Sequence, residues 1–295
     1  MIYEANKLCT RIYQKAPVID ARKNESGGCY MLNYDDIIRD SNFHEWKKYA
    51  PLDVQYLKYA ESDPSLVAVG HKIEDVYQAF CNARASFISA DSKDFGDIAG
   101  DDDISKLYMK CHFLLNALLE YAICLDISWQ VVWAYIQPSS LQYLMQQKYK
   151  KMEKECTRDN IVAQLKCAIS LHGVGFSKAQ KLLEEVTVFD NAQNTLKLRS
   201  LYNKIKHQGT IYFEGLGANF TNLSMGINGR VPSMLHRDSY KADDIENILF
   251  EYHEKFQIYM NKLIQIMVPE DYLESKMNLV DAINSIIHLA YIDDK

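Results

Sequence analysis

One long stretch, residues 104–136, constrains the fold of this chain more than any other feature. It reads ISKLYMKCHFLLNALLEYAICLDISWQVVWAYI and contains neither Gly nor Pro. Its apolar residues recur at helical spacing, and further apolar residues nearly surround the helix axis. A helix that is apolar on most sides is a buried one, so the stretch predicts a central core helix that ends before Pro138.

Polar residues within this stretch carry further information. Asn116, Glu120 and Asp126 interrupt the apolar sequence, which argues against a membrane-spanning helix. A buried carboxylate needs a partner, so Glu120 and Asp126 are expected either to make structural hydrogen bonds or to form the wall of a site. His112 lies on the same helix and is expected to be a hydrogen-bonded core histidine.

The rest of the chain also favours helices. Its 295 residues include only 12 Gly and 6 Pro, and 48% are hydrophobic against 24% charged. Sparse Gly and Pro favour long helices, and this apolar content can fill a large core. We therefore predict an all-α helical bundle around the helix 104–136. Further helices are expected at residues 2–16, 52–62, 71–90, 139–155, 158–170, 177–186, 191–207, 241–267 and 274–291.

Two segments break the helical pattern. Residues 90–103 are polar and rich in Asp, as expected of a linker whose acids suit the start of the next helix. The linker predicts an N-terminal helical accessory region, residues 1–100, and a main helical domain, residues 101–295. Residues 209–238 are rich in Gly and predict a small irregular or β-hairpin excursion.

Cysteine usage and the N-terminal sequence indicate the compartment. The seven cysteines are scattered and form no C-x-x-C pair, which indicates a reduced chain with free thiols. No signal-peptide pattern and no uninterrupted apolar stretch of about 20 residues is present, so we expect a cytoplasmic protein without membrane contact. The histidines lack ligand spacing and no glycine motif for nucleotides occurs, so neither a metal nor a cofactor is predicted.

Charge is distributed unevenly along the chain. The formal net charge of −6 argues against a dedicated nucleic-acid protein. Residues 141–210, however, hold 12 Lys and Arg against 6 Asp and Glu, and the remainder holds 21 against 33. This basic segment either attracts phosphate locally or is the solvated face of charged helices.

The basic segment ends in a helix whose last turns carry polar residues. The stretch 190–209 reads DNAQNTLKLRSLYNKIKHQG, with Asp190 expected as the N-cap and Gly209 as the C-terminal stop. Arg199, Asn203 and His207 are four residues apart and therefore share one face. His207 lies in the last turn, where the helix dipole favours its charged form.

The run Tyr202-Asn203-Lys204-Ile205-Lys206-His207 resembles the motif of the HEPN superfamily, all-α domains that include many metal-independent RNases of toxin and antiviral systems. In that family an Arg and a His are separated by four to six residues, often as Arg-Asn-x-x-x-His, at a helix end. Asn203 and His207 match, whereas Tyr202 stands at the Arg position. Arg199 is separated from His207 by seven residues, outside the family spacing. The resemblance covers about residues 104–265 and includes the long central helix.

The resemblance implies a mechanism for an active site here. His207 would exchange the proton of the RNA 2′-hydroxyl as general acid or base. Arg199 or Lys206 would stabilise charge on the phosphate, and Asn203 would orient His207 or the phosphate. Family sites usually form across a two-fold axis, so a homodimer is implied. Lys204 and Lys206 are expected to bind the nucleic acid, and Tyr202, Glu120 and Asp126 to line the site.

A second motif lies earlier in the basic segment. Residues 159–183 read DNIVAQLKCAISLHGVGFSKAQKLL and resemble a helix-hairpin-helix DNA-binding element. Gly173 and Gly175 would let backbone N–H groups approach a phosphate, and Lys178 and Lys181 would add charge. The alternative is an ordinary helix stopped by Gly and followed by a second helix.

These patterns leave three hypotheses for function. The first is a HEPN-like protein that engages RNA or nucleotides, including a divergent metal-independent RNase. The second is a non-catalytic helical interaction or scaffold protein, in which Tyr202 has replaced the catalytic Arg. The third is a DNA-associated protein that uses the hairpin at Gly173 and Gly175.

Overall fold

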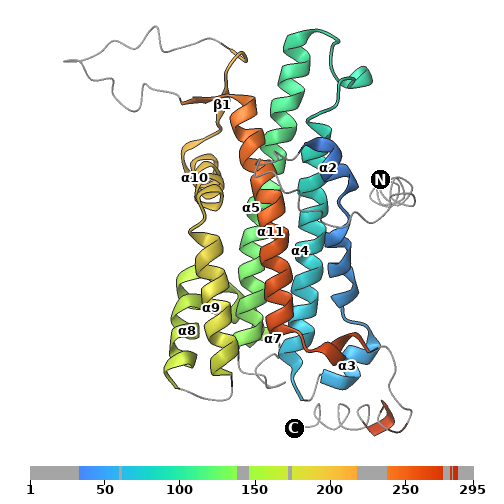
Figure 1. Cartoon of the computed structure of the whole chain (residues 1–295), viewed down its shortest axis with the longest axis vertical. Coiled ribbons are helices and arrows are strands. Elements are labelled where there is room, and N and C mark those ends of the chain that lie inside the picture. Colours follow the sequence, from blue (N-terminus) through green and yellow to red (C-terminus); the bar gives the residue numbers. More distant parts are fainter. Residues whose placement is uncertain are drawn as a thin grey trace, which may run out of the picture.

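The computed structural model describes residues 33–59, 62–137, 146–171, 175–217, 238–274, 280 and 282–284. Within these residues the protein is a helical bundle (Figure 1), which confirms the predicted fold class. The predicted helix 2–16, the first part of 139–155 and most of 274–291 lie outside the described residues.

Helix α5, Asp103–Ile136, is the predicted central helix and starts one residue earlier than expected. Asp102 is its N-cap, because its carboxylate accepts hydrogen bonds from the backbone N–H groups of Ile104 and Ser105 at 3.1 and 2.9 Å. An acceptor in this position satisfies N–H groups that have no partner within the helix. The Asp-rich linker therefore ends in a cap, as its composition predicted.

Two other long helices flank α5. Helices α4, Pro64–Ser89, and α11, Ala242–Met267, run beside it along the long axis of the molecule (Figure 1). α4 starts earlier than the predicted residue 71, with Pro64 in the first turn, where a missing N–H costs nothing. The helices meet through fully buried aromatic rings. The ring of Phe80 lies 5.7 Å from that of Tyr121 and 5.8 Å from that of Phe256.

A buried polar chain crosses this aromatic core. The Tyr121 hydroxyl lies 2.6 Å from Nδ1 of His253, and Nε2 of His253 lies 3.3 Å from Oδ2 of Asp40. With Tyr121 as donor to Nδ1, the imidazole proton on Nε2 is directed at the Asp40 carboxylate. Burial lowers the pKa of His253 despite this carboxylate. The chain therefore holds a neutral His253 and satisfies three polar groups inside the bundle.

Short elements at the N-terminal side close one flank of the bundle. They are α2 (Tyr34–Arg39), the 3₁₀ helix η1 (Asn42–Tyr49) and α3 (Asp53–Tyr59). Two further 3₁₀ helices are η2 (Gly96–Ile98), between α4 and α5 in the chain, and η5 (Glu270–Leu273), which follows α11 and contacts η1. Both η1 and η5 approach α4 closely at Gly70, because an added Cβ would collide with the Tyr272 hydroxyl of η5 and would lie 2.8 Å from the Tyr49 carbonyl oxygen of η1. Described residues on both sides of residue 100 contribute to one hydrophobic core, while the functional division at that position stays a prediction.

The second half of the bundle consists of shorter helices. They are α7 (Gln146–Lys154), α8 (Arg158–Ser170), α9 (Phe176–Asp190) and α10 (Gln193–Gln208). α8 and α9 lie side by side, whereas α10 is seen nearly end-on and so lies across the direction of α5 (Figure 1).

The Gly-rich excursion begins and ends in a short strand pair. β1, Tyr212–Phe213, pairs with β2, Ser239–Tyr240, in parallel. A β-hairpin would make this pairing antiparallel, so the hairpin interpretation is wrong for the described ends of the segment. Residues 218–237 lie outside the described residues.

By length and composition α5 could cross a membrane, the one such helix among the described residues. Half of its most apolar window is buried inside the bundle. It packs there against α4 and α11, which is compatible with the core helix of a soluble protein. Cys111 and Cys124 on this helix are free and buried.

Candidate functional site

Helix α10 presents the HEPN-like motif, and its burial explains which residues remain accessible. Asn194, Thr195, Leu198 and Leu201 face the core. The helix ends at Gly209, which has a φ of +109°. This region favours glycine, so the predicted C-terminal stop is confirmed.

The N-terminal end of α10 differs from the prediction. Asp190 is the last residue of α9, and Ala192, not Asp190, precedes α10 without any side-chain cap. The Asp190 carboxylate instead accepts hydrogen bonds from Nε of Arg158 at 2.6 Å and from Nε1 of Trp129 at 3.3 Å. The capping prediction is wrong because tertiary partners hold this buried carboxylate.

His207 and Asn203 are both exposed at the C-terminal end of α10. Lys206 is also exposed, and its ammonium lies 5.8 Å from the centre of the Tyr202 ring. Tyr202, at the Arg position of the family motif, is half-buried and packs against the core. The helix end therefore offers an imidazole, an amide and an ammonium to solvent, without a guanidinium at position 202.

Lys204 is engaged elsewhere. Its ammonium forms an ion pair with Asp238 and lies 3.1 Å from the Tyr240 hydroxyl. These contacts connect α10 to the residues just before and within β2. Lys204 therefore holds the base of the excursion, and a phosphate would have to compete with Asp238 for it.

Arg199 lies in a different environment from His207. Its guanidinium stands 4.8 Å from the centre of the Trp129 ring. Eight helical residues at 1.5 Å each separate the backbones of Arg199 and His207 by about 12 Å. The predicted meeting of Arg199 and His207 on one phosphate is therefore disfavoured by the helix geometry.

The two acidic residues of α5, Asp126 and Glu120, lie in different surroundings. Asp126 is half-buried, and burial raises its pKa although Lys206 and Arg199 counteract the increase. Burial alone raises the pKa of Glu120. Of the two carboxylates predicted to line a site, Asp126 faces the cations of α10, whereas Glu120 does not.

Asp126 and Arg199 line a pocket of about 440 Å³ between α5, α8 and α10. The remaining lining residues are Trp129, Gln130, Cys156, Thr157, Arg158 and Asp159. Trp129 and Arg158 were not predicted from the sequence as members of this site. The only sequence signal for Arg158 was its position directly after Thr157, the N-cap of α8. That position does not indicate which distant residue Arg158 contacts.

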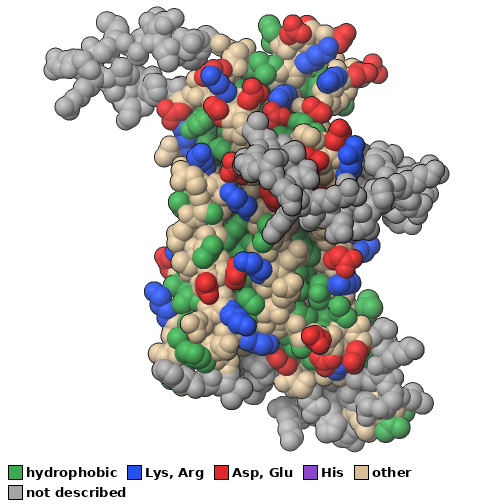
Figure 2. Space-filling model, in the orientation of Figure 1, with side chains coloured by type: hydrophobic (Ala, Val, Ile, Leu, Met, Phe, Trp, Pro, Cys, Tyr) green, Lys and Arg blue, Asp and Glu red, His purple; other side chains and the backbone are tan. Residues whose placement is uncertain are grey.

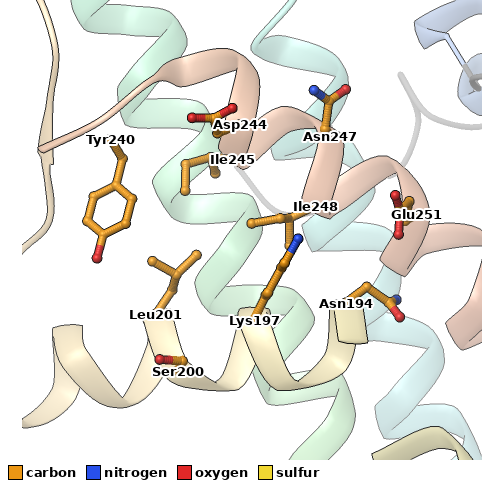
Figure 3. A pocket seen from close by; sticks show the side chains of 10 residues that line it. All are labelled: Asn194, Lys197, Ser200, Leu201, Tyr240, Asp244, Ile245, Asn247, Ile248 and Glu251. Atoms are coloured by element: carbon orange, nitrogen blue, oxygen red, sulfur yellow. The ribbon is translucent and has the colours of Figure 1, made fainter. Parts of the chain in front are cut away.

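A second pocket, of about 510 Å³, lies between the opposite side of α10 and α11. Figure 3 shows the Lys197 side chain reaching toward Ile248, with Tyr240 and Leu201 at one end and Asn194 and Glu251 at the other. Its lining mixes apolar and polar groups contributed by both helices. None of the predicted site residues lines this pocket.

The described residues include only part of the predicted helix-hairpin-helix element. α8 and α9 form two adjacent helices, and Gly175 is the residue before α9. Gly173 lies outside the described residues. Lys181 is exposed, and the exposed Lys178 places its ammonium 5.7 Å from the centre of the Tyr135 ring.

His112 is exposed, so the expectation of a core histidine is wrong. Its Nε2 lies 3.0 Å from the Asn116 amide one turn later, and its ring stacks with that of Tyr108. α5 is apolar on most sides, but this turn faces solvent. Among the described residues, no group of three or more His, Cys, Asp and Glu is arranged to hold a metal ion.

The described surface carries no extended basic patch on the face shown in Figure 2, where basic and acidic side chains alternate. Fold and site together define an all-α bundle with an exposed, histidine-bearing helix end and a nearby pocket of mixed charge. Comparison with protein-family models, with curated proteins and with solved structures gives no significant match.

Proposed function

We propose that this chain is a HEPN-like helical protein of the cytoplasm that binds RNA through the exposed end of α10. The observation that carries the proposal is the accessibility of the His207 imidazole at the last turn of that helix. Asn203, one turn earlier, and Lys206 are exposed as well. The three groups can donate hydrogen bonds to phosphate and ribose oxygens, as RNA recognition requires.

Binding receives more support than cleavage. Cleavage of RNA needs an acid–base group for proton transfer, which His207 supplies. It also needs a positioned cation that stabilises the charge developing on the phosphate. Arg199 lies on the Trp129 ring instead, and Tyr202 packs against the core. Lys206 is then the cation nearest in the chain to His207. A divergent metal-independent RNase would depend on this pair, His207 and Lys206, with Asn203 orienting the phosphate.

The family resemblance adds a homodimer to the proposal. In a two-fold assembly the α10 ends of two copies would face each other and supply two imidazoles and two ammonium groups. Two alternatives to RNA binding stand beside this proposal. One is DNA binding by the hairpin at Gly175, and the other is a scaffold that binds no nucleic acid. Measurement of mass in solution and of nucleic-acid binding separates these cases.

A binding experiment tests the proposal directly. Fluorescence anisotropy of a labelled single-stranded RNA should report binding that Lys206→Ala weakens for every sequence. Loss of one phosphate contact should reduce the slope of log affinity against log salt by about 0.7. Lys93→Ala, an exposed lysine between α4 and η2, is the matched control. Absence of RNA binding by the wild-type protein would refute the proposal.

Cleavage is measured on the same RNA. If the wild-type protein forms product, His207→Ala should slow the reaction by about 10²- to 10⁴-fold, the contribution of a positioned acid or base. His112→Ala is the control, since that histidine is also exposed on a helix. Binding without product identifies a binding module, whereas equal cleavage by His207→Ala would remove His207 from the mechanism.

A further inference from the structure

The pocket between α5, α8 and α10 joins acidic, basic and aromatic groups that no other part of the proposed function uses. Asp126 and Trp129 come from α5, Arg158 from the first turn of α8 and Arg199 from α10. Its volume of about 440 Å³ falls within the range of small-ligand sites. The pocket therefore has room for one planar group with several hydrogen-bonding atoms.

Asp190 supports two of these groups from behind. Its carboxylate is 1% exposed and accepts from Nε of Arg158 and from the indole N–H of Trp129. Nε of Arg158 is held by Asp190, and Nη1 lies 3.7 Å from Oδ1 of Asp159 at the lining of the pocket. A ligand would therefore compete with Asp159 for Nη1. A fixed guanidinium loses little freedom when it binds a ligand.

Arg199 provides a flat surface in the same pocket. Its guanidinium carbon lies 4.8 Å from the centre of the Trp129 ring, and both residues line the pocket. Nucleic-acid bases stack on Arg planes of this kind in single-stranded RNA complexes. The stack favours a planar ligand over a tetrahedral phosphate.

The charges of the pocket also disfavour a phosphate as its ligand. Arg158 and Arg199 are balanced by Asp126 and Asp159 at the lining and by Asp190 behind it. An anion would approach three carboxylates along with two guanidinium groups. A neutral ligand that offers donors to a carboxylate and acceptors to an arginine fits better.

We propose that this pocket binds a single guanine base of the RNA, extruded from the strand, and so selects the sequence at the α10 end. Guanine carries adjacent N1–H and N2–H donors, which one carboxylate can accept together, and it presents O6 and N7 to an arginine. Asp126 would accept from the donor edge, Arg158 would donate to O6 or N7, and Arg199 would stack on the ring. Adenine, cytosine and uracil lack the pair of adjacent donors.

The position of the pocket agrees with the proposed RNA site, on which this inference rests. Arg199 lies about 12 Å along α10 from His207. A stacked strand advances about 3.4 Å per nucleotide, so a base in the pocket lies a few nucleotides from a phosphate at His207. One strand could therefore contact both the middle of α10 and its C-terminal end.

The test compares two short RNAs on the full-length protein. Both are oligouridines, one with a single central guanine and the other with adenine at that place. The wild-type protein should bind the guanine RNA about 5- to 100-fold more tightly, the range of one bidentate base contact. Asp126→Asn, which replaces one acceptor by a donor, should remove this preference. Glu120→Gln, a half-buried acid of the same helix outside the pocket, should retain it.

Arg199→Lys supplies a second variant that preserves charge. A lysine has no planar group on which a base can stack. If a base of either RNA stacks in the pocket, Arg199→Lys should lower the affinity for both RNAs. Equal affinity of the wild-type protein for the two RNAs, or a preference that survives Asp126→Asn, would overturn the guanine pocket while RNA binding stands. Binding of guanosine monophosphate but of no RNA would support the pocket and refute the proposed RNA site.

Discussion

Removing the two partners of the Arg158–Asp190 ion pair one at a time should destabilise the protein unequally. The two groups are 2.6 Å apart, but their surroundings differ. The side chain of Asp190 is 1% exposed, whereas that of Arg158 is 29% exposed. Without its partner, Arg158 can still reach water, whereas Asp190 remains buried away from water.

The magnitudes follow from this difference. In Asp190→Ala, Arg158 can turn to solvent, so the loss is a charged hydrogen bond and an unsatisfied Trp129 N–H, about 1–3 kcal/mol. In Arg158→Ala the Asp190 carboxylate stays buried without its cation, which costs about 3–5 kcal/mol at neutral pH. The double variant should be close to Asp190→Ala, because removal of the carboxylate also removes the uncompensated charge.

The pH dependence gives the sharper measurement. Burial raises the pKa of Asp190 even though Arg158 counteracts the increase, and loss of Arg158 should raise that pKa further. A group whose pKa is higher in the folded state gives stability when protonated and loses it as pH rises through the folded pKa. The free energy of unfolding of Arg158→Ala should therefore increase from pH 8 to pH 5, relative to the double variant.

Urea denaturation followed by circular dichroism at pH 5 and pH 8 measures all four proteins. We expect Arg158→Ala to be the least stable of the four at pH 8 and to approach the stability of Asp190→Ala at pH 5. If Arg158→Ala cost no more than Asp190→Ala at pH 8, the buried carboxylate would not be carrying an uncompensated charge. An equal difference at both pH values would likewise contradict a raised pKa.

Two further predictions concern the bundle core. Gly70→Ala should lower the free energy of unfolding by about 1–3 kcal/mol, because the new Cβ would lie 2.8 Å from the Tyr49 carbonyl oxygen. Gly175→Ala, which meets nothing within 4 Å, should change little in the same thermal or urea titration. Acidification should destabilise the protein below pH 6.5, because burial lowers the pKa of His253 and the unfolded chain therefore takes up that proton first. A second decline is expected below pH 3.8, since hydrogen bonds lower the pKa of Asp40 despite its burial. His253→Gln should lack the first decline.

The sequence predicted those features of the fold that depend on local pattern. α5 and α8 end within one residue of expectation, since helical periodicity, Asp102 and Thr157 caps and following breakers all act over a few residues. Gly209 stops α10 for the same local reason. These elements needed no knowledge of the partners against which they pack.

The pocket was not predicted, because its contacts join distant parts of the chain. Asp190 follows the pattern of an N-cap, yet its partners lie 32 and 61 residues earlier, at Arg158 and Trp129. Arg199 shares a face with His207 by spacing, but the indole of Trp129 sets its direction. The local sequence determines which helix carries each residue. The packing of α5 against α8 and α10 determines which partners its side chain contacts.

The parallel pairing of β1 with β2 has a consequence for how this protein can change over time. Both ends of the intervening segment are fastened next to α10, by the strand pair and by the Lys204–Asp238 ion pair. The entropy needed to close a loop grows only slowly with its length, so residues could be gained or lost between these strands at small cost. Insertions at this place should leave the helix end undisturbed, which makes the segment a natural place for diversification and for attaching a tag or a second domain.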